Sequence, residues 1–162
     1  MREDFQKRLS PEPLNSYYLV VKRATVILML ILQCILGLKS QSIDFINAFS
    51  QAYIPSGEPV FVEITRYFKS DVGQCDVVLR LEKIVDGQDK AAYLWYEKLR
   101  NCLLDFVFVA SKVGTCLFMY KTFMCVVYVD DCLFWARSQY DIDNVMKSFK
   151  DDVPTCNWDH HP

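Results

Sequence analysis

The chain has few of the residues that break or loosen a fold. Its 162 residues include only 5 Gly and 6 Pro, and we find no low-complexity tract and no internal repeat. Together with a hydrophobic content of 52% and an aromatic content of 14%, this scarcity argues against extensive disorder, and the lack of a repeat argues against a repeat architecture. At this length we expect one domain with a sizeable core.

Paired cysteines and an excess of positive charge are also missing. The 7 Cys are scattered and odd in number, and no CxxC occurs, so neither a zinc site nor a full disulfide framework is indicated. Cysteines inside apolar runs behave as small buried hydrophobes, so we expect reduced thiols in an intracellular protein. The net charge of −2 predicts weak binding to nucleic acid, since affinity for a duplex depends on cations that meet phosphates.

No apolar run reaches the length of a membrane span. The longest, 24–38, follows Lys22 and Arg23 and so mimics a signal anchor. A spanning helix needs about 20 apolar residues, whereas this run has 15 and contains Gln33. No small-residue cleavage site follows it. A buried core helix is favoured, and a membrane anchor through 24–38 is the alternative.

Apolar periodicity predicts three helices and a set of short strands. The helices are expected over 23–38, 90–106 and 141–150, the last with Asp141 as its N-cap. Helices gathered on one face of an antiparallel sheet make an α+β domain. The strands are expected over 42–45, 60–64, 77–81, 116–120, 123–128 and 132–136.

At the end of the chain, His160 and His161 beside Asp159 could bind a metal, but a frayed tail is favoured.

The most informative motif is Tyr-Val-Asp-Asp at 128–131, set between two apolar runs. The pattern predicts two short strands that meet at a pair of carboxylates. Adjacent acids are costly to hold together unless a cation neutralises them, and Mg²⁺ is usually held by one or two carboxylates plus substrate phosphates. An ordinary hairpin would carry Asn-Gly or Asp-Gly at this tip. The acids Asp130 and Asp131 therefore suggest phosphoryl transfer.

A third carboxylate for such a site is plausible at Asp44, inside the short strand-like run 42–45. Two metal ions that clamp an in-line displacement need a convergent set of carboxylates. Asp44 precedes Asp130 by 86 positions, which is far enough for two strands of one sheet. Isolated Asp residues at strand ends are common, so an ordinary surface acid is the alternative.

Taken together, these segments resemble the reverse transcriptase of copia-type LTR retrotransposons over most of the chain, from about Val20 to Trp158. Residues 43–49 look like the first palm motif of that family, 78–99 like its second and 116–131 like its third. Their order and spacing agree throughout. Residues 134–136 and 157–160 also resemble a subgroup typical of diatoms and other algae. The resemblance implies a polymerase palm-like α+β fold.

The resemblance implies a metal site and a reaction. Asp44 and Asp130 would be the main ligands of two Mg²⁺ ions, with Asp131 as the third carboxylate and Mn²⁺ as a possible substitute. The reaction would be attack of a primer 3′-hydroxyl on the α-phosphate of a deoxynucleotide. The protein would contribute positioning and charge neutralisation.

The resemblance also implies residues that bind substrate. Phe49 would lie under the sugar of the incoming nucleotide and leave no room for a 2′-hydroxyl. Tyr128 would lie near the primer end. Gly87 and Gln88 would open the helix of the second motif, on which the templating base pair rests. The partners would be an RNA or DNA template–primer and deoxynucleotides, with no membrane.

The extent of the resemblance suggests a partial domain. Residues 1–16 form a divergent N-terminal segment, and 17–162 form a reverse transcriptase palm domain with incomplete fingers and without thumb or RNase H regions of a polyprotein. We therefore expect weak activity, or none, from the chain alone.

Several residues depart from the family pattern. Asp86 stands where a tyrosine is usual, and Tyr93 stands where an arginine is usual. Scattered losses with the three acids intact are typical of an element copy that drifts without selection. A non-catalytic remnant that keeps the palm fold is thus the alternative to an enzyme. Further departures occur at Gly114-Thr115, Ile27 and Tyr53.

Overall fold

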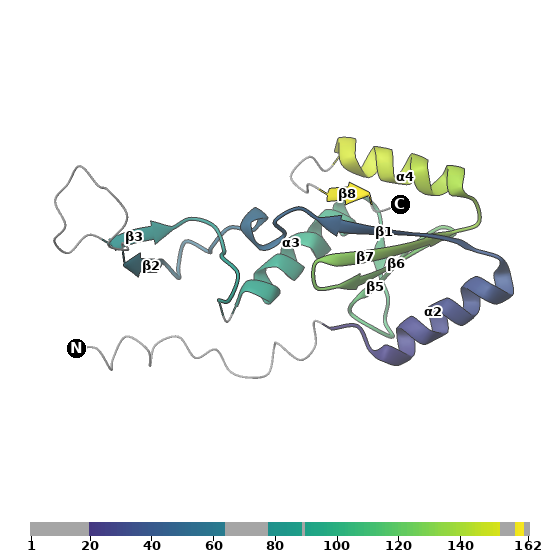
Figure 1. Ribbon diagram of the computed structural model, residues 1–162, viewed down its shortest axis with the longest axis horizontal. Helices are drawn as coiled ribbons and strands as arrows, with labels where there is room; N and C mark the ends of the chain where they lie inside the picture. Colours follow the sequence, from purple (N-terminus) through teal and green to yellow (C-terminus); the bar gives the residue numbers. More distant parts are fainter. Residues whose placement is uncertain (1–19, 64–77, 89, 153–157, 161–162) are drawn as a thin grey trace.

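The protein folds as an α+β domain, as the sequence predicts (Figure 1). The structure is a computed structural model that describes residues 20–63, 78–88, 90–152 and 158–160, with side chains up to residue 150. The three helices lie close to the predicted ranges. In chain order the elements are α2 (Arg23–Leu36), β1 (Lys39–Phe45), the 3₁₀ turn η2 (Phe49–Gln51), β2 (Val60–Glu63), β3 (Val78–Leu81), α3 (Ala91–Asp105), β4 (Val109–Ala110), β5 (Leu117–Tyr120), β6 (Phe123–Tyr128), β7 (Asp131–Ala136), α4 (Gln139–Asp152) and β8 (Trp158–His160).

The main sheet has six antiparallel strands in the order β4-β5-β6-β7-β1-β8. Strands β5, β6 and β7 form a meander, and the earlier strand β1 lies between β7 and β8. Two of these strands, β4 and β8, were not predicted. The prediction of a frayed C-terminal tail is wrong for 158–160, because these residues pair with β1.

The larger core lies between the sheet and the helices α3 and α4. Trp95 and Leu99 of α3 are fully buried in it, as are Phe118 and Phe134 of the sheet. Helix α4 contributes the apolar stripe that the sequence predicts, and Ile142, Met146 and Phe149 of this stripe are buried. The packing energy of the domain is therefore concentrated on this face.

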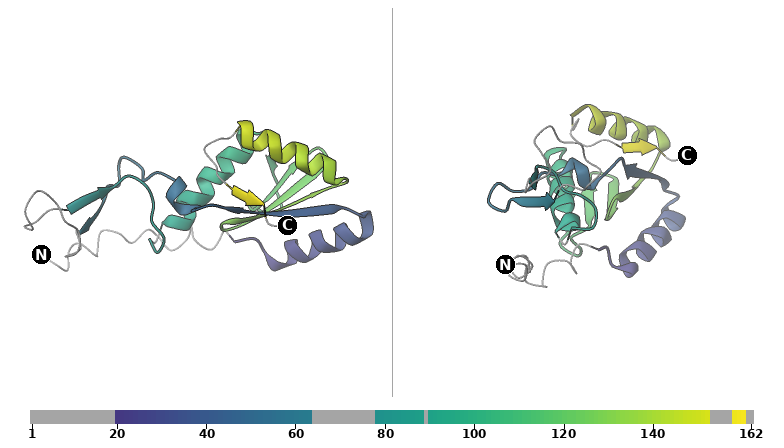
Figure 2. Two further views of the ribbon diagram at one scale, coloured as in Figure 1. Left: turned by 45° about the horizontal axis from the view of Figure 1, so that its top comes forward. Right: turned by 60° about the vertical axis from the view of Figure 1, so that its left-hand side comes forward.

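Helix α2 covers the opposite face of the sheet, so the expectation that all helices lie on one face is not met (Figure 2). Its residue Met29 packs there with Val126 and Trp135. Among the described residues, no helix is both long and apolar enough to cross a membrane. Much of α2 remains exposed in this structure, including Ile27, Leu28, Leu30, Ile31, Ile35 and Leu36.

Local signals set the ends of two helices. Helix α2 ends at Gly37, which has a φ of +63° and whose amide donates to the carbonyl of Gln33. This left-handed cap is favourable for glycine, which lacks a Cβ. Helix α4 begins earlier than predicted, because Ser138 Oγ accepts a hydrogen bond from the Asp141 amide at 3.1 Å. Ser138 thus acts as the cap, and Asp141 lies in the first turn.

Strands β2 and β3 form a separate two-stranded sheet that projects from the main domain (Figure 1). Backbone hydrogen bonds from Ile54 to Glu82 and from Ile84 to Ala52 join its base to the domain. Ile84 is buried there beside Ala52 and the first turn of α3. Among the described residues, these contacts anchor the projecting sheet at its base.

The packing of α2 can be tested by a pair of substitutions. Met29→Ala should lower the free energy of unfolding by about 2–3 kcal/mol, because it removes a buried side chain that contacts the sheet. Ile35→Ala is the control, since Ile35 is 72% exposed and its loss should change stability by less than about 0.5 kcal/mol. Urea denaturation measures both values. Equal effects would contradict the placement of α2 on the sheet.

Candidate active site

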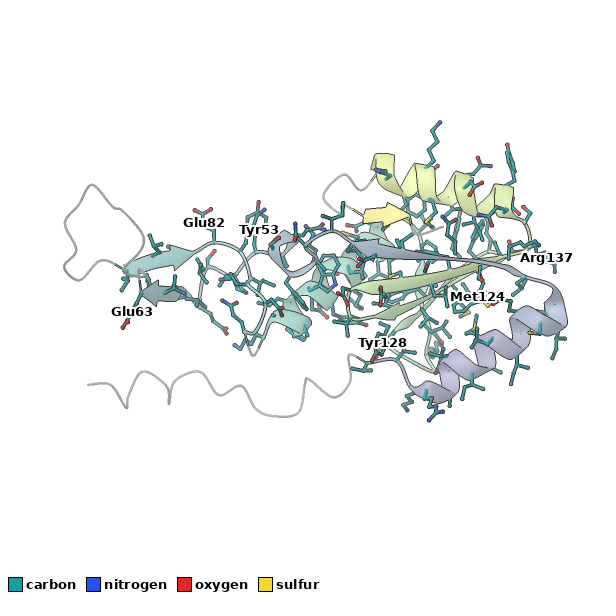
Figure 3. The ribbon with its side chains drawn as sticks, viewed as in Figure 1. Tyr53, Glu63, Glu82, Met124, Tyr128 and Arg137 are labelled. Atoms are coloured by element: carbon teal, nitrogen blue, oxygen red, sulfur yellow. The ribbon has the colours of Figure 1, made fainter. Side chains whose placement is uncertain are left out.

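The register of the sheet brings Asp44, Asp131 and Tyr128 into one row across three strands. Asp44 of β1 is paired with Asp131 of β7, and Asp131 is paired with Tyr128 of β6. Directly opposite residues of antiparallel strands project from the same face, with Cβ atoms about 4.5–5.5 Å apart. The two carboxylates and the phenol ring therefore lie on one face. Figure 3 shows Tyr128 on the side of the sheet where α2 lies.

Strand alternation explains why these polar side chains face away from the main core. Ile43 and Phe45 flank Asp44 and are buried against α3 and α4, whereas Asp44 is half-buried. Cys132 follows the exposed Asp131 and is buried on the same core face. Because side chains alternate along a strand, burying these apolar residues places the acids on the other face.

Asp130 lies in the tight turn between β6 and β7. We call residues 128–131 the acid turn. Its two central residues are Val129 and Asp130, and φ is +56° at Val129 but not positive at Asp130. A positive φ at the first central position alone is the pattern of a type II′ turn, in which that position favours glycine. A β-branched valine there carries strain of about 1–3 kcal/mol.

Two hydrogen bonds hold the acid turn against the rest of the domain. Trp95 of α3 donates from its indole Nε1 to the carbonyl oxygen of Val129 at 2.9 Å. The amide of Phe45 donates to the carbonyl oxygen of Asp130 at 3.3 Å. Sequence reasoning missed the role of Trp95, because this contact joins residues that are 34 positions apart.

Phe49 lies in η2, close after the strand that carries Asp44. Its ring is half-buried and packs against the apolar clusters that include Ala48 and Ala52. From α3, Lys98 Nζ donates to the carbonyl oxygen of Gln51 at 2.8 Å, which ties the turn to the helix. The position of Phe49 is therefore fixed by the apolar packing of its ring and by the hydrogen bond that ties its turn to α3.

Gly87 and Gln88 lie in the loop that leads into α3, since the helix begins at Ala91. Gly87 has a φ of +85°, and its amide donates to the carboxylate of Asp86 at 2.8 Å. The unusual acid at 86 thus stabilises the loop locally. It also places a negative charge next to the residues that the sequence assigns to the nucleotide floor.

The donor set of the acids fits a hard divalent cation, because Mg²⁺ binds carboxylate oxygens in preference to nitrogen or sulfur. Within the described part of the chain, however, no three His, Cys, Asp or Glu side chains are grouped closely enough to hold a metal ion. Asp44 and Asp131 both take part in other interactions. The fold brings the acid-bearing positions together without a finished coordination cluster.

The thiols near the acid turn are structural. None of the five described cysteines forms a disulfide, and four of them are buried. Burial raises the pKa of the Cys116 thiol and raises that of Cys132 well above its usual value. Both thiols therefore stay protonated at neutral pH and act as small apolar side chains, as the sequence predicts.

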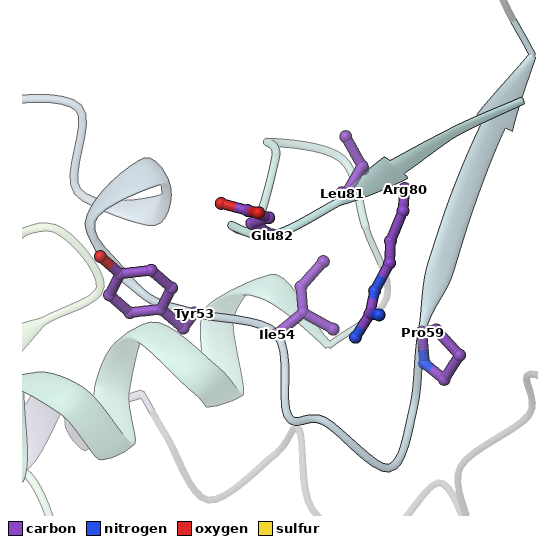
Figure 4. Close-up of a pocket in the computed structure, with 6 residues that line it drawn as sticks. All are labelled: Tyr53, Ile54, Pro59, Arg80, Leu81 and Glu82. Atoms are coloured by element: carbon purple, nitrogen blue, oxygen red, sulfur yellow. The ribbon is translucent and has the colours of Figure 1, made fainter.

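A pocket of about 360 Å³ lies at the base of the projecting β2–β3 sheet (Figure 4). Arg80 and Glu82 line it together with the aromatic ring of Tyr53. None of its lining residues belongs to the acid turn or to β1. It is therefore not part of the site formed by the three acids.

The strain at the acid turn can be measured directly. Val129→Gly should raise the free energy of unfolding by about 1 kcal/mol, because the relief of the strained φ exceeds the extra entropy of a glycine in the unfolded chain. Val113→Gly is the control, since Val113 is exposed and its φ is not positive, and it should bring no gain. Thermal unfolding compares the two. A loss of stability in Val129→Gly would contradict the strained turn.

Comparison with known proteins agrees with this arrangement. The family model described as Reverse transcriptase (RNA-dependent DNA polymerase) matches residues 3–155, which is nearly the whole chain. A search of curated proteins finds no match. The matched region contains β1, α3 and the acid turn, on which the candidate site is built. The chain therefore belongs to the reverse transcriptase (RNA-dependent DNA polymerase) family.

Proposed function

We propose that this chain is the palm region of a copia-type reverse transcriptase that adds deoxynucleotides to a primer 3′-hydroxyl. The observation that carries the proposal is the pairing of Asp44 with Asp131 beside the turn that holds Asp130. It stands in a chain that matches the reverse transcriptase family over residues 3–155. The subgroup typical of diatoms and algae is part of the proposal and rests on residues 134–136 and 157–160 alone.

In this proposal the three carboxylates Asp44, Asp130 and Asp131 hold two Mg²⁺ ions, or Mn²⁺ in their place. The ions would supply charge stabilisation for the attacking and leaving oxygens. The half-buried Asp44 is held on β1, which is paired on both sides, and Asp130 is held through the carbonyl groups on both sides of its Cα. Such fixed positions suit phosphoryl transfer, in which positioning and electrostatics contribute most of the catalysis.

The same proposal assigns substrate contacts to residues around the acids. Phe49 would contact the sugar of the incoming nucleotide, and its packed, half-buried ring would exclude a 2′-hydroxyl. Tyr128 is 52% exposed at the end of β6, which leaves its ring accessible to the primer end. Gly87 and Gln88 would support the templating base pair from the loop before α3.

A catalytically weak or inactive copy is the second candidate. The carboxylate of Asp86 accepts a hydrogen bond from the Gly87 amide, and its negative charge at this position would oppose the binding of a polyphosphate. Tyr93 on the first turn of α3 supplies no cation to offset it. This observation favours a palm fold that persists with reduced activity.

The proposed metal site can be tested without catalysis. Millimolar Mg²⁺ should raise the melting temperature of the unmodified protein by about 2–4 °C, because a ligand that binds only the folded state stabilises it. Asp130→Asn should abolish this gain, whereas Asp105→Asn, at the exposed end of α3, should keep it. Scanning calorimetry with and without Mg²⁺ measures the shift. A melting temperature that does not respond to Mg²⁺ would count against the site.

Catalysis distinguishes the working enzyme from the inactive copy. When the segment replaces its counterpart in an intact copia-type polymerase, Asp86→Asn should raise primer extension by about fivefold, or roughly 1 kcal/mol of barrier. Asparagine retains a side-chain oxygen that can accept the hydrogen bond from the Gly87 amide. The variant therefore removes the negative charge and preserves the loop conformation. Tyr93→Arg should add to the gain. Strong Mg²⁺-dependent extension by the unmodified chain, lost in Asp130→Asn, would overturn the inactive reading.

A further inference from the structure

The acid turn depends on a tryptophan from another element. Trp95 lies on α3 and is 0% exposed, and its indole Nε1 is 2.9 Å from the carbonyl oxygen of Val129. A buried indole N–H has to find an acceptor, because leaving it unpaired would forfeit its hydrogen bonds to water. In this structure the acceptor is the central carbonyl of the strained turn.

The accepting carbonyl determines the geometry of the turn. The peptide between Val129 and Asp130 is the central peptide of the type II′ turn. Turn types that share the same end points differ by a flip of this peptide, which changes ψ of the first central residue and φ of the second. A flip reverses the carbonyl of Val129 and leaves the flanking Cα and Cβ atoms nearly in place. The hydrogen bond from Trp95 therefore fixes the turn type and holds the backbone that carries Asp130 against α3.

The ring of Trp95 also contacts the strand that carries the other acid. Its centroid is 5.1 Å from that of Phe45, at an interplanar angle of 66°. Phe45 follows Asp44 on β1, and its amide donates to the carbonyl oxygen of Asp130 at 3.3 Å. One buried side chain thus contacts the strand of Asp44 and the turn of Asp130 at the same time.

We propose that Trp95 is a positioning residue of the metal site, which holds the backbone of Asp130 in place through the hydrogen bond to Val129 and locks the turn to β1 through Phe45. The inference rests on the proposed function, because it assigns Asp130 to a metal. A side chain that only fills the core would need the ring volume of Trp95 and not its N–H. The N–H is aimed at the central peptide of the turn, which directly precedes the Cα of Asp130.

A second tryptophan supplies a matched control. Trp135 is also 0% exposed, and its Nε1 donates to Gln33 Oε1 at 2.8 Å. This hydrogen bond joins β7 to α2 and does not involve the acid turn. Trp95→Phe and Trp135→Phe therefore each remove one buried indole hydrogen bond and keep an aromatic ring. Only the first removes a bond to the turn of Asp130.

Two measurements on the full chain test the proposal. NMR couplings and chemical shifts report the backbone torsions of Val129 and Asp130, and electron paramagnetic resonance of free Mn²⁺ reports metal affinity. We expect Trp95→Phe to change these torsions and to weaken Mn²⁺ binding by about tenfold, as for other residues that orient a metal ligand. Trp135→Phe should leave the torsions unchanged and the affinity within about twofold. Asp130→Asn marks the loss of the site.

The outcomes separate this inference from the proposed function. If Mn²⁺ binds the unmodified protein and Trp95→Phe equally well, while Asp130→Asn binds it weakly, Trp95 has no positioning role and the metal site stands. If the unmodified protein binds no Mn²⁺, the proposed function fails, and the torsions still decide the role of Trp95. Torsions that are the same in Trp95→Phe and in the unmodified protein would then overturn it.

Discussion

The pairing of β1 with β7 is the constraint on which the candidate site depends. It places Asp44 directly opposite Asp131, although like charges in that position destabilise a sheet. The neighbouring pair in the same register is Ile43 with Cys132, and both are buried in the main core. A slip of one residue would turn Asp44 into that core and expose Ile43. The apolar pairs therefore force the acids to remain side by side.

Helix α3 transmits this constraint to the rest of the site. Its residue Trp95 donates a hydrogen bond to the acid turn. Lys98, three residues later on the helix, donates one to the carbonyl oxygen of Gln51, two residues after Phe49. The buried face of the helix is thus both a core surface and a set of fixed anchor points. Two segments that lie far apart in the sequence, the acid turn and the turn of Phe49, are thus positioned by one helix.

The sequence predicts the elements with strong apolar patterns and gives less information about their partners. The β6–β7 hairpin follows from two continuous apolar runs on either side of a turn, and the apolar stripe of α4 follows from helical periodicity. The placement of α2 could not be predicted, because a helix that is apolar on most sides does not reveal which side faces the sheet. Strands β4 and β8 are too short to show a pattern and exist through pairing with their neighbours.

The same distinction applies to the candidate site. The three acids were found as sequence motifs, and the family resemblance implies that they converge. The pairing of β1 with β7, which puts Asp44 opposite Asp131, is seen only in the sheet itself. The contact of Trp95 with Val129 could not be found in this way, since it depends on how α3 packs across the sheet. The role of Asp86 as acceptor of the Gly87 amide likewise depends on the local loop geometry.

Two costs in free energy coincide at the acid turn. Val129 adopts a φ that disfavours β-branched residues, and Asp131 lies opposite another carboxylate. Either cost could be removed by one substitution that leaves the buried residues unchanged. Violations of local preference are expected at functional positions, where the surrounding structure maintains them. Around this turn the buried Trp95 and Phe45 provide that support, so the strain is local while the scaffold remains well packed. A divalent cation between the carboxylates would remove the electrostatic cost and leave only the strain at Val129.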